Sequence, residues 1–264
     1  MNPKIPVEIP TLSWSERVYY RDQLRAGRYA ALADAEGFQA ICFAVEALGM
    51  RLYGKKEALG GYKTSLAVLA RDSLVLSELA FRDSARFSDF GSLFGLVYSA
   101  RNDAMHTGVY ARHATAAAIE LCIGLEEALM KEQQIARRSA KDFMVKSPII
   151  VEPWQPIAYA RQLMLTHSFS FIPVYIENQW WLISEGAMAR FLNVPRPEKM
   201  RVFAVPITEA RAAGLTLIKA EVIDMNTSVD DLLSPANDER DPRLWLVEEN
   251  PGRLCGVLSP FELM

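Results

Sequence analysis

The distribution of proline divides the chain into two parts. No proline occurs between Pro10 and Pro148, whereas 11 of the 14 prolines lie from Pro148 onward. Because proline lacks a backbone N–H and clashes with the preceding helical turn, such a long proline-free stretch favours α-helices. We therefore expect an all-helical N-terminal half, residues 1–136, followed by an α/β C-terminal half, residues 137–264.

Apolar residues at helical spacing predict the helices of the first half. The sequence Ser13-Trp14-Ser15-Glu16 has the spacing of a capping box, which starts a helix. Helices that pack as an up-and-down bundle account for the rest of this half. The ranges that we expect are helices at 30–52, 65–81, 96–105 and 114–134, a loop at 53–62 and a break at 90–95.

The second half contains two similar runs of elements. Each run reads strand, helix, strand, turn, strand, and ends with a serine that opens a helix, Ser184 in the first run and Ser259 in the second. This weak internal repeat covers about residues 140–192 and 215–264, with an insertion at 193–216. Two such units can bury their apolar faces against each other. The expected strands are 149–151, 171–176, 180–183, 217–223, 244–247 and 254–258, and the expected helices are 156–166 and 228–233.

Charge and cysteine content exclude several classes of protein. A net charge of −3 gives no general attraction to nucleic acid, so a polyanion site must be a local patch. Cys42, Cys122 and Cys255 have neither metal-ligand spacing nor a disulfide pattern, which predicts buried, reduced thiols and no metal site. Residues 1–10 lack the apolar core of a signal peptide, and no apolar run has the length of a membrane span. We expect a cytoplasmic protein without a membrane partner.

The segment that best supports catalysis is Arg101-Asn102-Asp103-Ala104-Met105-His106. Arginine supplies a permanent positive charge with a fork geometry that suits a phosphate, and histidine can transfer a proton near neutral pH. Together they suit RNA cleavage by the RNA's own 2′-hydroxyl, because that reaction needs no metal. Asn102 can position a phosphate or the imidazole. The alternative is structural: Arg101 and Asp103 make surface pairs, and His106 ends a helix.

This R-N-x-x-x-H motif, which precedes the last long helix of a helical bundle, resembles the HEPN family over roughly residues 14–134. The resemblance implies a homodimer in which the two motifs face each other, with RNA as the substrate. It also implies that Arg101 and His106 are catalytic and that Asn102 supports them. Many HEPN domains are metal-independent ribonucleases, and others are inactive binding modules.

The C-terminal repeats resemble a pair of CBS domains over about residues 140–264. The resemblance implies that the pair binds an adenine nucleotide or a related ligand between its repeats. The family's signature for ribose and phosphate is G-x-x-S/T-x-x-D. The second repeat offers Gly256, Ser259 and Glu262, with glutamate in place of aspartate. A carboxylate at that position can accept hydrogen bonds from ribose hydroxyls.

The first repeat departs further from the signature. Trp181 replaces the glycine, Ser184 is kept as a ligand-binding candidate, and Ala187 replaces the acid. For the second repeat, the sequence from Ser259 to Glu262 has a structural alternative, because it also has the spacing of a capping box with proline at the first helical position.

The combined prediction is a metal-independent HEPN-type endoribonuclease that needs no cofactor for catalysis and is regulated by an adenine nucleotide at the CBS pair. A toxin or defence factor is one role for such an enzyme. The alternative is a non-catalytic nucleotide-sensing or dimerisation scaffold, or a regulatory subunit. Four basic residues are candidates for RNA backbone contacts or for a solvated polar face. They are Arg112, Lys131, Arg137 and Arg138.

Overall fold

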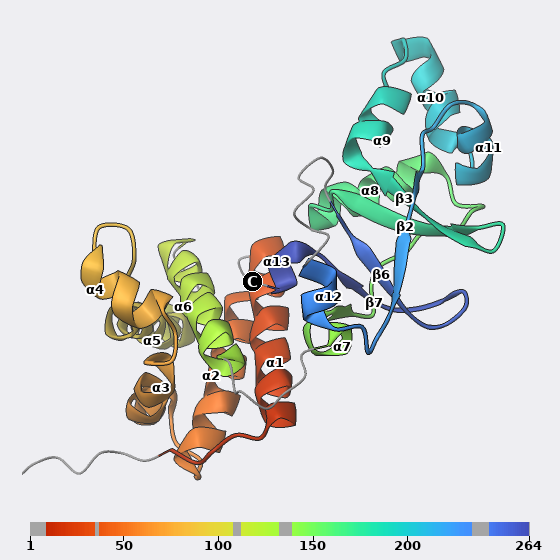
Figure 1. Cartoon of the computed structure of the whole chain (residues 1–264). Helices are drawn as coiled ribbons and strands as arrows, with labels where there is room; N and C mark the ends of the chain where they lie inside the picture. The colour runs from red at the N-terminus through yellow and green to blue at the C-terminus, as the bar shows by residue number, and fades with distance from the viewer. Residues whose placement is uncertain (1–8, 35–36, 108–111, 132–138, 234–242, 264) are drawn as a thin grey trace, which may run out of the picture. The chain divides into compact units, whose positions relative to one another are not determined.

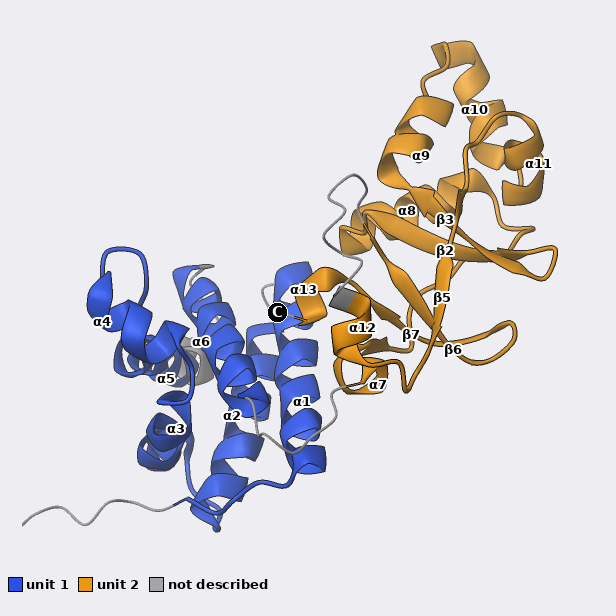
Figure 2. Ribbon diagram, viewed as in Figure 1, with its two compact units in different colours: residues 1–136 blue, residues 137–264 orange. Residues whose placement is uncertain are grey.

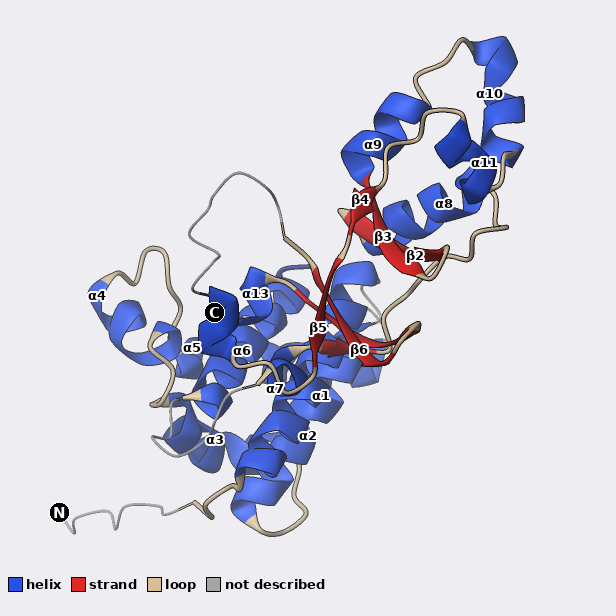
Figure 3. Ribbon diagram, turned by 45° about the vertical axis from the view of Figure 1, so that its right-hand side comes forward, coloured by secondary structure: helices blue, strands red, loops and turns tan. Residues whose placement is uncertain are grey.

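In the computed structural model of the protein, the chain divides into two compact units, Met1–Ala136 and Arg137–Met264 (Figures 1 and 2). Unit 1 consists of helices, and unit 2 combines two sheets with short helices (Figure 3). The expected fold class, a helical bundle followed by an α/β module, is confirmed. The structure describes residues 9–34, 37–107, 112–131, 139–233 and 243–263, without the side chains of residues 104–107, 112 and 233.

Unit 1 is built around α1, which packs against both α2 and α6, while α5 packs against α6. Leucines at helical spacing on these elements form its core, among them Leu24, Leu48 and Leu121, which are fully buried. The elements are α1 (Trp14–Ala33), α2 (Phe38–Tyr53), the 3₁₀-helix η2 (Leu59–Tyr62), α3 (Lys63–Ala70), the π-helix η3 (Val75–Leu79), α4 (Ala80–Arg82), α5 (Phe90–Thr107) and α6 (Arg112–Met130).

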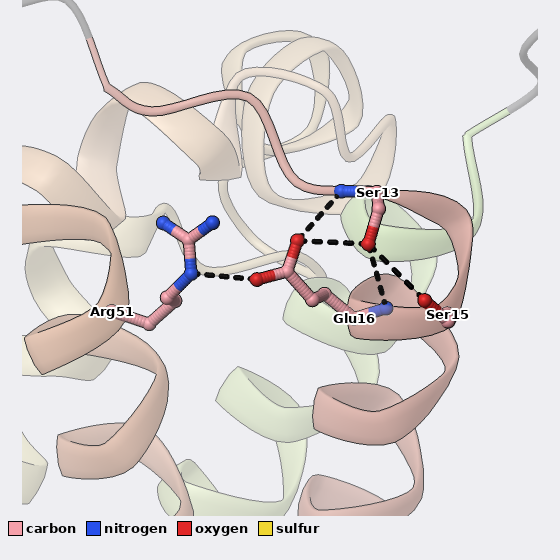
Figure 4. A network of polar contacts seen from close by, with 4 residues as sticks. All are labelled: Ser13, Ser15, Glu16 and Arg51. Carbon is pink, nitrogen blue, oxygen red and sulfur yellow. Dashed lines mark hydrogen bonds and ion pairs between the residues drawn. The ribbon is translucent and has the colours of Figure 1, made fainter.

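The predicted capping box starts α1 (Figure 4). The Glu16 backbone N–H donates to Ser13 Oγ at 3.3 Å, and the Ser13 N–H donates to Glu16 Oε2 at 2.9 Å. The other carboxylate oxygen of Glu16 accepts a 2.7 Å hydrogen bond from Arg51 Nε on α2. These bonds, of which the one from Arg51 contributes most, lower the pKa of Glu16 to about 2.

This lowered pKa predicts how the stability of unit 1 depends on pH. The unfolded chain takes up the Glu16 proton near its usual pKa of 4.5, before the folded chain does. The stabilisation by Glu16 is therefore complete above that pH and is lost as the pH falls toward 2. We expect the difference in melting temperature between wild type and Glu16→Gln to shrink continuously over this range. Glu120→Gln, at an exposed position on α6, is the control. A constant difference for Glu16→Gln from pH 7 to pH 2 would contradict the assignment.

Two predicted helices are interrupted in the structure. The range 30–52 is not one helix, because α1 ends at Ala33 and α2 begins at Phe38. Before α2, the Gly37 N–H donates to the Asp34 carbonyl. The range 65–81 is also divided. Glu127 on α6 accepts hydrogen bonds from Ser73 Oγ at 2.5 Å and from the next two backbone N–H groups. The Glu127 carboxylate, from a distant part of the chain, accepts hydrogen bonds from the free N–H groups at the start of η3. α3 and η3 are therefore separate elements.

The predicted break at 90–95 is wrong, because α5 runs through both of its glycines. The Asp89 carboxylate stabilises the start of α5 by accepting from the Ser92 N–H at 3.1 Å and from Ser92 Oγ at 2.6 Å. These bonds lower the pKa of Asp89. Phe94 and Val97 on the next turns are buried against the bundle. Capping and burial together outweigh the low helix propensity of glycine.

Unit 2 contains the predicted order of elements twice. Two predicted ranges change in kind: 149–151 is reduced to one parallel bridge between Val151 and Val174, and 217–223 is divided into β4 and β5. The other predicted ranges shift by up to three residues at an end, and the strand at Val145–Lys146 was not predicted. The strands are β1 (Val145–Lys146), β2 (Phe171–Ile176), β3 (Gln179–Ser184), β4 (Ile218–Lys219), β5 (Glu221–Asp224), β6 (Trp245–Asn250) and β7 (Arg253–Leu258). The helices are α7 (Ala140–Phe143), α8 (Ile157–His167), α9 (Glu185–Phe191), α10 (Arg196–Ala204), α11 (Ile207–Ala212), α12 (Val229–Leu233) and α13 (Pro260–Leu263).

The two sheets of unit 2 have the same pairing pattern. In the first repeat, the Val151 bridge is parallel to β2, and β2, β3 and β4 pair antiparallel. In the second repeat, β5 is parallel to β6, and β6, β7 and β1 pair antiparallel. The strand that precedes each repeat therefore completes the sheet of the other repeat. This exchange makes the two repeats a single unit with internal two-fold pseudosymmetry.

The repeats also share a core. Trp180 and Leu182 of the first repeat pack with Ala220 and Leu246. The Trp180 indole N–H donates a 2.6 Å hydrogen bond to Glu248 of the second repeat, so the polar edge of this buried ring is satisfied. The expectation that the two repeats bury apolar faces against each other is confirmed.

Candidate functional sites

Arg101 lies on α5 and forms an ion pair with Glu46 of α2. The arginine side chain is 27% exposed and the glutamate 23%, so both groups are half-buried yet accessible from outside unit 1. A guanidinium carries five N–H donors, and one carboxylate cannot use all of them. Arg101 is thus held in position by Glu46 and retains donors for an anion.

The surroundings of this ion pair are apolar on the inner side. Cys42, one turn before Glu46 on α2, is buried, and burial raises the pKa of its thiol to about 12, although the nearby Arg101 charge acts in the opposite direction. A thiol with this pKa is not a nucleophile near neutral pH. Burial also raises the pKa values of Cys122 and Cys255. The prediction of buried thiols holds for Cys42 and Cys122, whereas Cys255 is half-buried.

The remaining motif residues lie along α5. Asn102 is half-buried next to Arg101, and Asp103 is exposed. His106 belongs to α5, but its side chain lies outside the described part of the structure. Positions five residues apart on a regular helix differ by about 140° around its axis. The helix by itself therefore does not bring Arg101 and His106 of one copy to the same point.

Glu46 is the residue of this site that the sequence prediction missed. Its signal was a carboxylate in the middle of the apolar pattern of α2, between Val45 and Leu48, which are both fully buried. A charged residue in such a position requires a partner, but periodicity alone does not identify which residue provides it.

The proposed RNA-backbone contacts have little support from geometry. The ammonium of Lys131 is paired with Asp72 at 2.6 Å. The Arg112 side chain, Arg137 and Arg138 lie outside the described residues. Among the residues that are described, no group of three or more histidine, cysteine, aspartate or glutamate side chains is placed to bind a metal ion.

In the second repeat of unit 2, half of the capping box that was the structural alternative is present. Glu262 Oε2 accepts from the Ser259 N–H at 2.8 Å and from Ser259 Oγ at 2.5 Å, so the motif carboxylate is engaged with the residue before α13. Gly256 lies on β7, where an added Cβ would come within 2.4 Å of the Met144 sulfur. Close packing against Met144 therefore accounts for the absence of a side chain at position 256. A ligand-binding role for these three residues stays a prediction.

The first repeat uses its motif positions differently. Ser184 caps α9 by accepting a 3.1 Å hydrogen bond from the Ala187 N–H. The guanidinium of Arg211 lies over the Trp181 ring, 4.5 Å from its centre. The indole at the place of the motif glycine is therefore part of a cation–π pair, and no carboxylate follows Ser184 at the motif spacing.

No protein-family model and no curated protein matches the chain. Solved structures that are similar to about half of the chain are CBS-domain proteins. A CBS-domain protein from Agrobacterium tumefaciens is 17% identical over 50% of this chain and 95% of its own, with a TM-score of 0.37. One from Bacillus anthracis is 20% identical over 50% and 91%, with a TM-score of 0.37. CBSX2 in complex with AMP is 17% identical over 47% and 92%, with a TM-score of 0.37.

No helix among the described residues combines the length and the apolar character that crossing a membrane requires.

Proposed function

We propose that unit 2 is a CBS-type pair that binds an adenine nucleotide. The observation that carries the proposal is the strand exchange, in which β1 completes the sheet of β7 and β4 completes the sheet of β3. This symmetry places Ser184 and Ser259 equivalently, each at the helix that follows a hairpin. Of the two half-sites, the second keeps a carboxylate, Glu262, which makes it the candidate for ribose recognition.

A Glu262→Ala variant tests the assignment of Glu262 to ribose recognition. In calorimetric titrations with AMP, ADP and ATP, wild type should bind at least one nucleotide, and Glu262→Ala should weaken that binding by roughly tenfold through loss of a charged acceptor. Glu262→Gln keeps an acceptor for the Ser259 cap and separates the effect of the cap from that of the charge. Glu221→Ala, on exposed β5, is the control. Unchanged affinity in Glu262→Ala removes the ribose contact, and absence of binding to all three nucleotides contradicts the proposal.

A second candidate function, RNA cleavage by unit 1, is favoured by the position of Arg101. Its guanidinium is held by Glu46 at the surface of α5, on the same helix as His106. The 2′-hydroxyl loses its proton to water as its oxygen forms a bond to the adjacent phosphorus, and the bond from phosphorus to the 5′-oxygen breaks. Arg101 stabilises charge on the phosphate oxygens, and His106 protonates the departing 5′-oxygen. The products are a 2′,3′-cyclic phosphate and a 5′-hydroxyl end.

A homodimer would complete this site. Because Arg101 and His106 are five positions apart on one helix and face different sides of it, two copies related by a two-fold axis can supply the arginine and the histidine from opposite sides. In this arrangement the nucleotide at unit 2 regulates cleavage if it binds two dimer geometries with different affinity. The alternative is a scaffold in which unit 1 only dimerises. Cleavage of RNA by the purified protein in a metal chelator separates the two.

A further inference from the structure

A cavity of about 740 Å³ lies in unit 2, on the insertion between the two repeats. It is bounded by α9, α10, α11 and the turn that follows α11. Its volume is within the range of small-molecule sites. Ala187 is one of its lining residues, at the motif position where CBS repeats have an acid. The first repeat therefore has an apolar surface where the second has the Glu262 carboxylate.

The lining of this cavity combines apolar side chains with both signs of charge. Phe191 of α9, with Val202 of α10, contributes apolar surface. Arg190 and Arg201 contribute two guanidiniums, and two carboxylates come from α10 and α11. These carboxylates are Glu198 and Glu209.

Within the described part of the chain, none of these four charged side chains has an ion-pair or hydrogen-bond partner. All four side chains are exposed, so water solvates them when no ligand is bound. Two cations and two anions around one cavity thus leave both kinds of charge available to a ligand.

We propose that this cavity binds a zwitterion with an apolar body, of the chemical class of apolar α-amino acids. A ligand with only an anionic group would pair with Arg190 and Arg201 but would meet the unpaired carboxylates. A cationic ligand would pair with Glu198 and Glu209 but would meet the two guanidiniums. An uncharged apolar ligand would pair with none of the four charges. A ligand carrying a carboxylate, an ammonium and an apolar side chain satisfies the guanidiniums, the carboxylates and the apolar surface together.

Calorimetric titration of the full chain tests this proposal with L-leucine and L-phenylalanine as probes. The half-ligands 4-methylpentanoate and 3-methylbutylamine carry the apolar body of leucine with only one of its charges. We expect an amino-acid probe to bind at least about tenfold more tightly than either half-ligand, because each lacks one set of charge-assisted hydrogen bonds. Failure of both amino acids to bind, or equal binding of a half-ligand, overturns the proposal.

Variants locate the binding to this cavity. Arg201→Met and Glu209→Gln should each weaken it about tenfold, and Val202→Trp should abolish it by filling the space. Arg196→Met, an exposed position on α10 that does not line the cavity, should bind like wild type. If Val202→Trp does not fold, Glu209→Gln still tests whether the amino acid binds in this cavity. Binding that is unchanged in Arg201→Met and Glu209→Gln refutes the site. The Glu262→Ala variant should bind the amino acid as wild type does. A failure of the nucleotide proposal can therefore be told apart from a failure of the amino-acid proposal.

Discussion

An Arg101→Ala variant is expected to cleave RNA at least about 100-fold more slowly than wild type, because it loses the positioned charge that stabilises the phosphate oxygens in the transition state. His106→Ala should have a loss of similar size through the missing proton donor. The measurement is the initial rate of cleavage of a labelled RNA in chelator, with and without adenine nucleotide. The products of wild type should carry 2′,3′-cyclic phosphate ends.

Removing Arg101 also leaves Glu46 without its cation, so a structural effect must be separated from a catalytic one. Glu46→Gln removes the same ion pair but keeps the guanidinium, and should retain roughly a tenth or more of the activity. Arg86→Ala, an exposed arginine paired with Asp83, is the matched control and should cleave like wild type. Equal losses in Arg101→Ala and Glu46→Gln would make Arg101 a structural residue. Equal cleavage by all variants would indicate a contaminating nuclease, and no cleavage by wild type would favour the scaffold.

Gly37→Ala is expected to destabilise unit 1 by about 3 kcal/mol, within the range for overpacked sites. The backbone angles of Gly37 suit any residue, so its role is steric. A Cβ at this position would lie 2.3 Å from the carbonyl carbon of Ala30 on α1. Because both atoms would belong to backbone-anchored groups, only a displacement of α1 from α2 relieves the overlap. Urea unfolding followed by circular dichroism measures the loss.

Gly95→Ala on α5 is the control for this prediction. A Cβ there meets no atom within 4 Å, so alanine should stabilise the helix by roughly 0.5–1 kcal/mol through its higher helix propensity. The two glycine-to-alanine changes therefore have opposite expected signs. A Gly37→Ala variant as stable as wild type would show that α1 and α2 are not in close contact at this point.

Short-range signals allowed many elements to be predicted correctly. Ser13 and Glu16 start α1 as their spacing predicted, and β2 has the predicted bounds 171–176. These features depend on neighbours within a few residues. The errors occurred where a distant group decides the local structure. Glu127 of α6 separates α3 from η3, although it lies more than 50 residues from the N–H groups that it accepts.

The candidate sites show the same division. The sequence drew attention to Arg101 by its motif, but not to Glu46, because 55 positions separate the two residues and only the packing of α2 near α5 joins them. The motif at Ser259 and Glu262 was compatible with a ligand contact and with a capping box, and in the structure the Glu262 carboxylate accepts the Ser259 N–H as in a capping box. The four charges of the insertion cavity come from three helices, with Glu198 and Arg201 both on α10, and no spacing in the sequence indicates that these three helices share one space.

The sequence by itself determined where helices give way to an α/β architecture, through the absence of proline between Pro10 and Pro148, and it determined the repeated order of elements after that point. The tertiary structure decided which strand completes which sheet, which carboxylate holds Arg101, and which charged groups surround a cavity. The physical reason is the distance along the chain over which each kind of interaction acts. Backbone sterics and hydrophobic periodicity act between neighbours in the chain, whereas strand exchange and ion pairing depend on groups that only packing brings together.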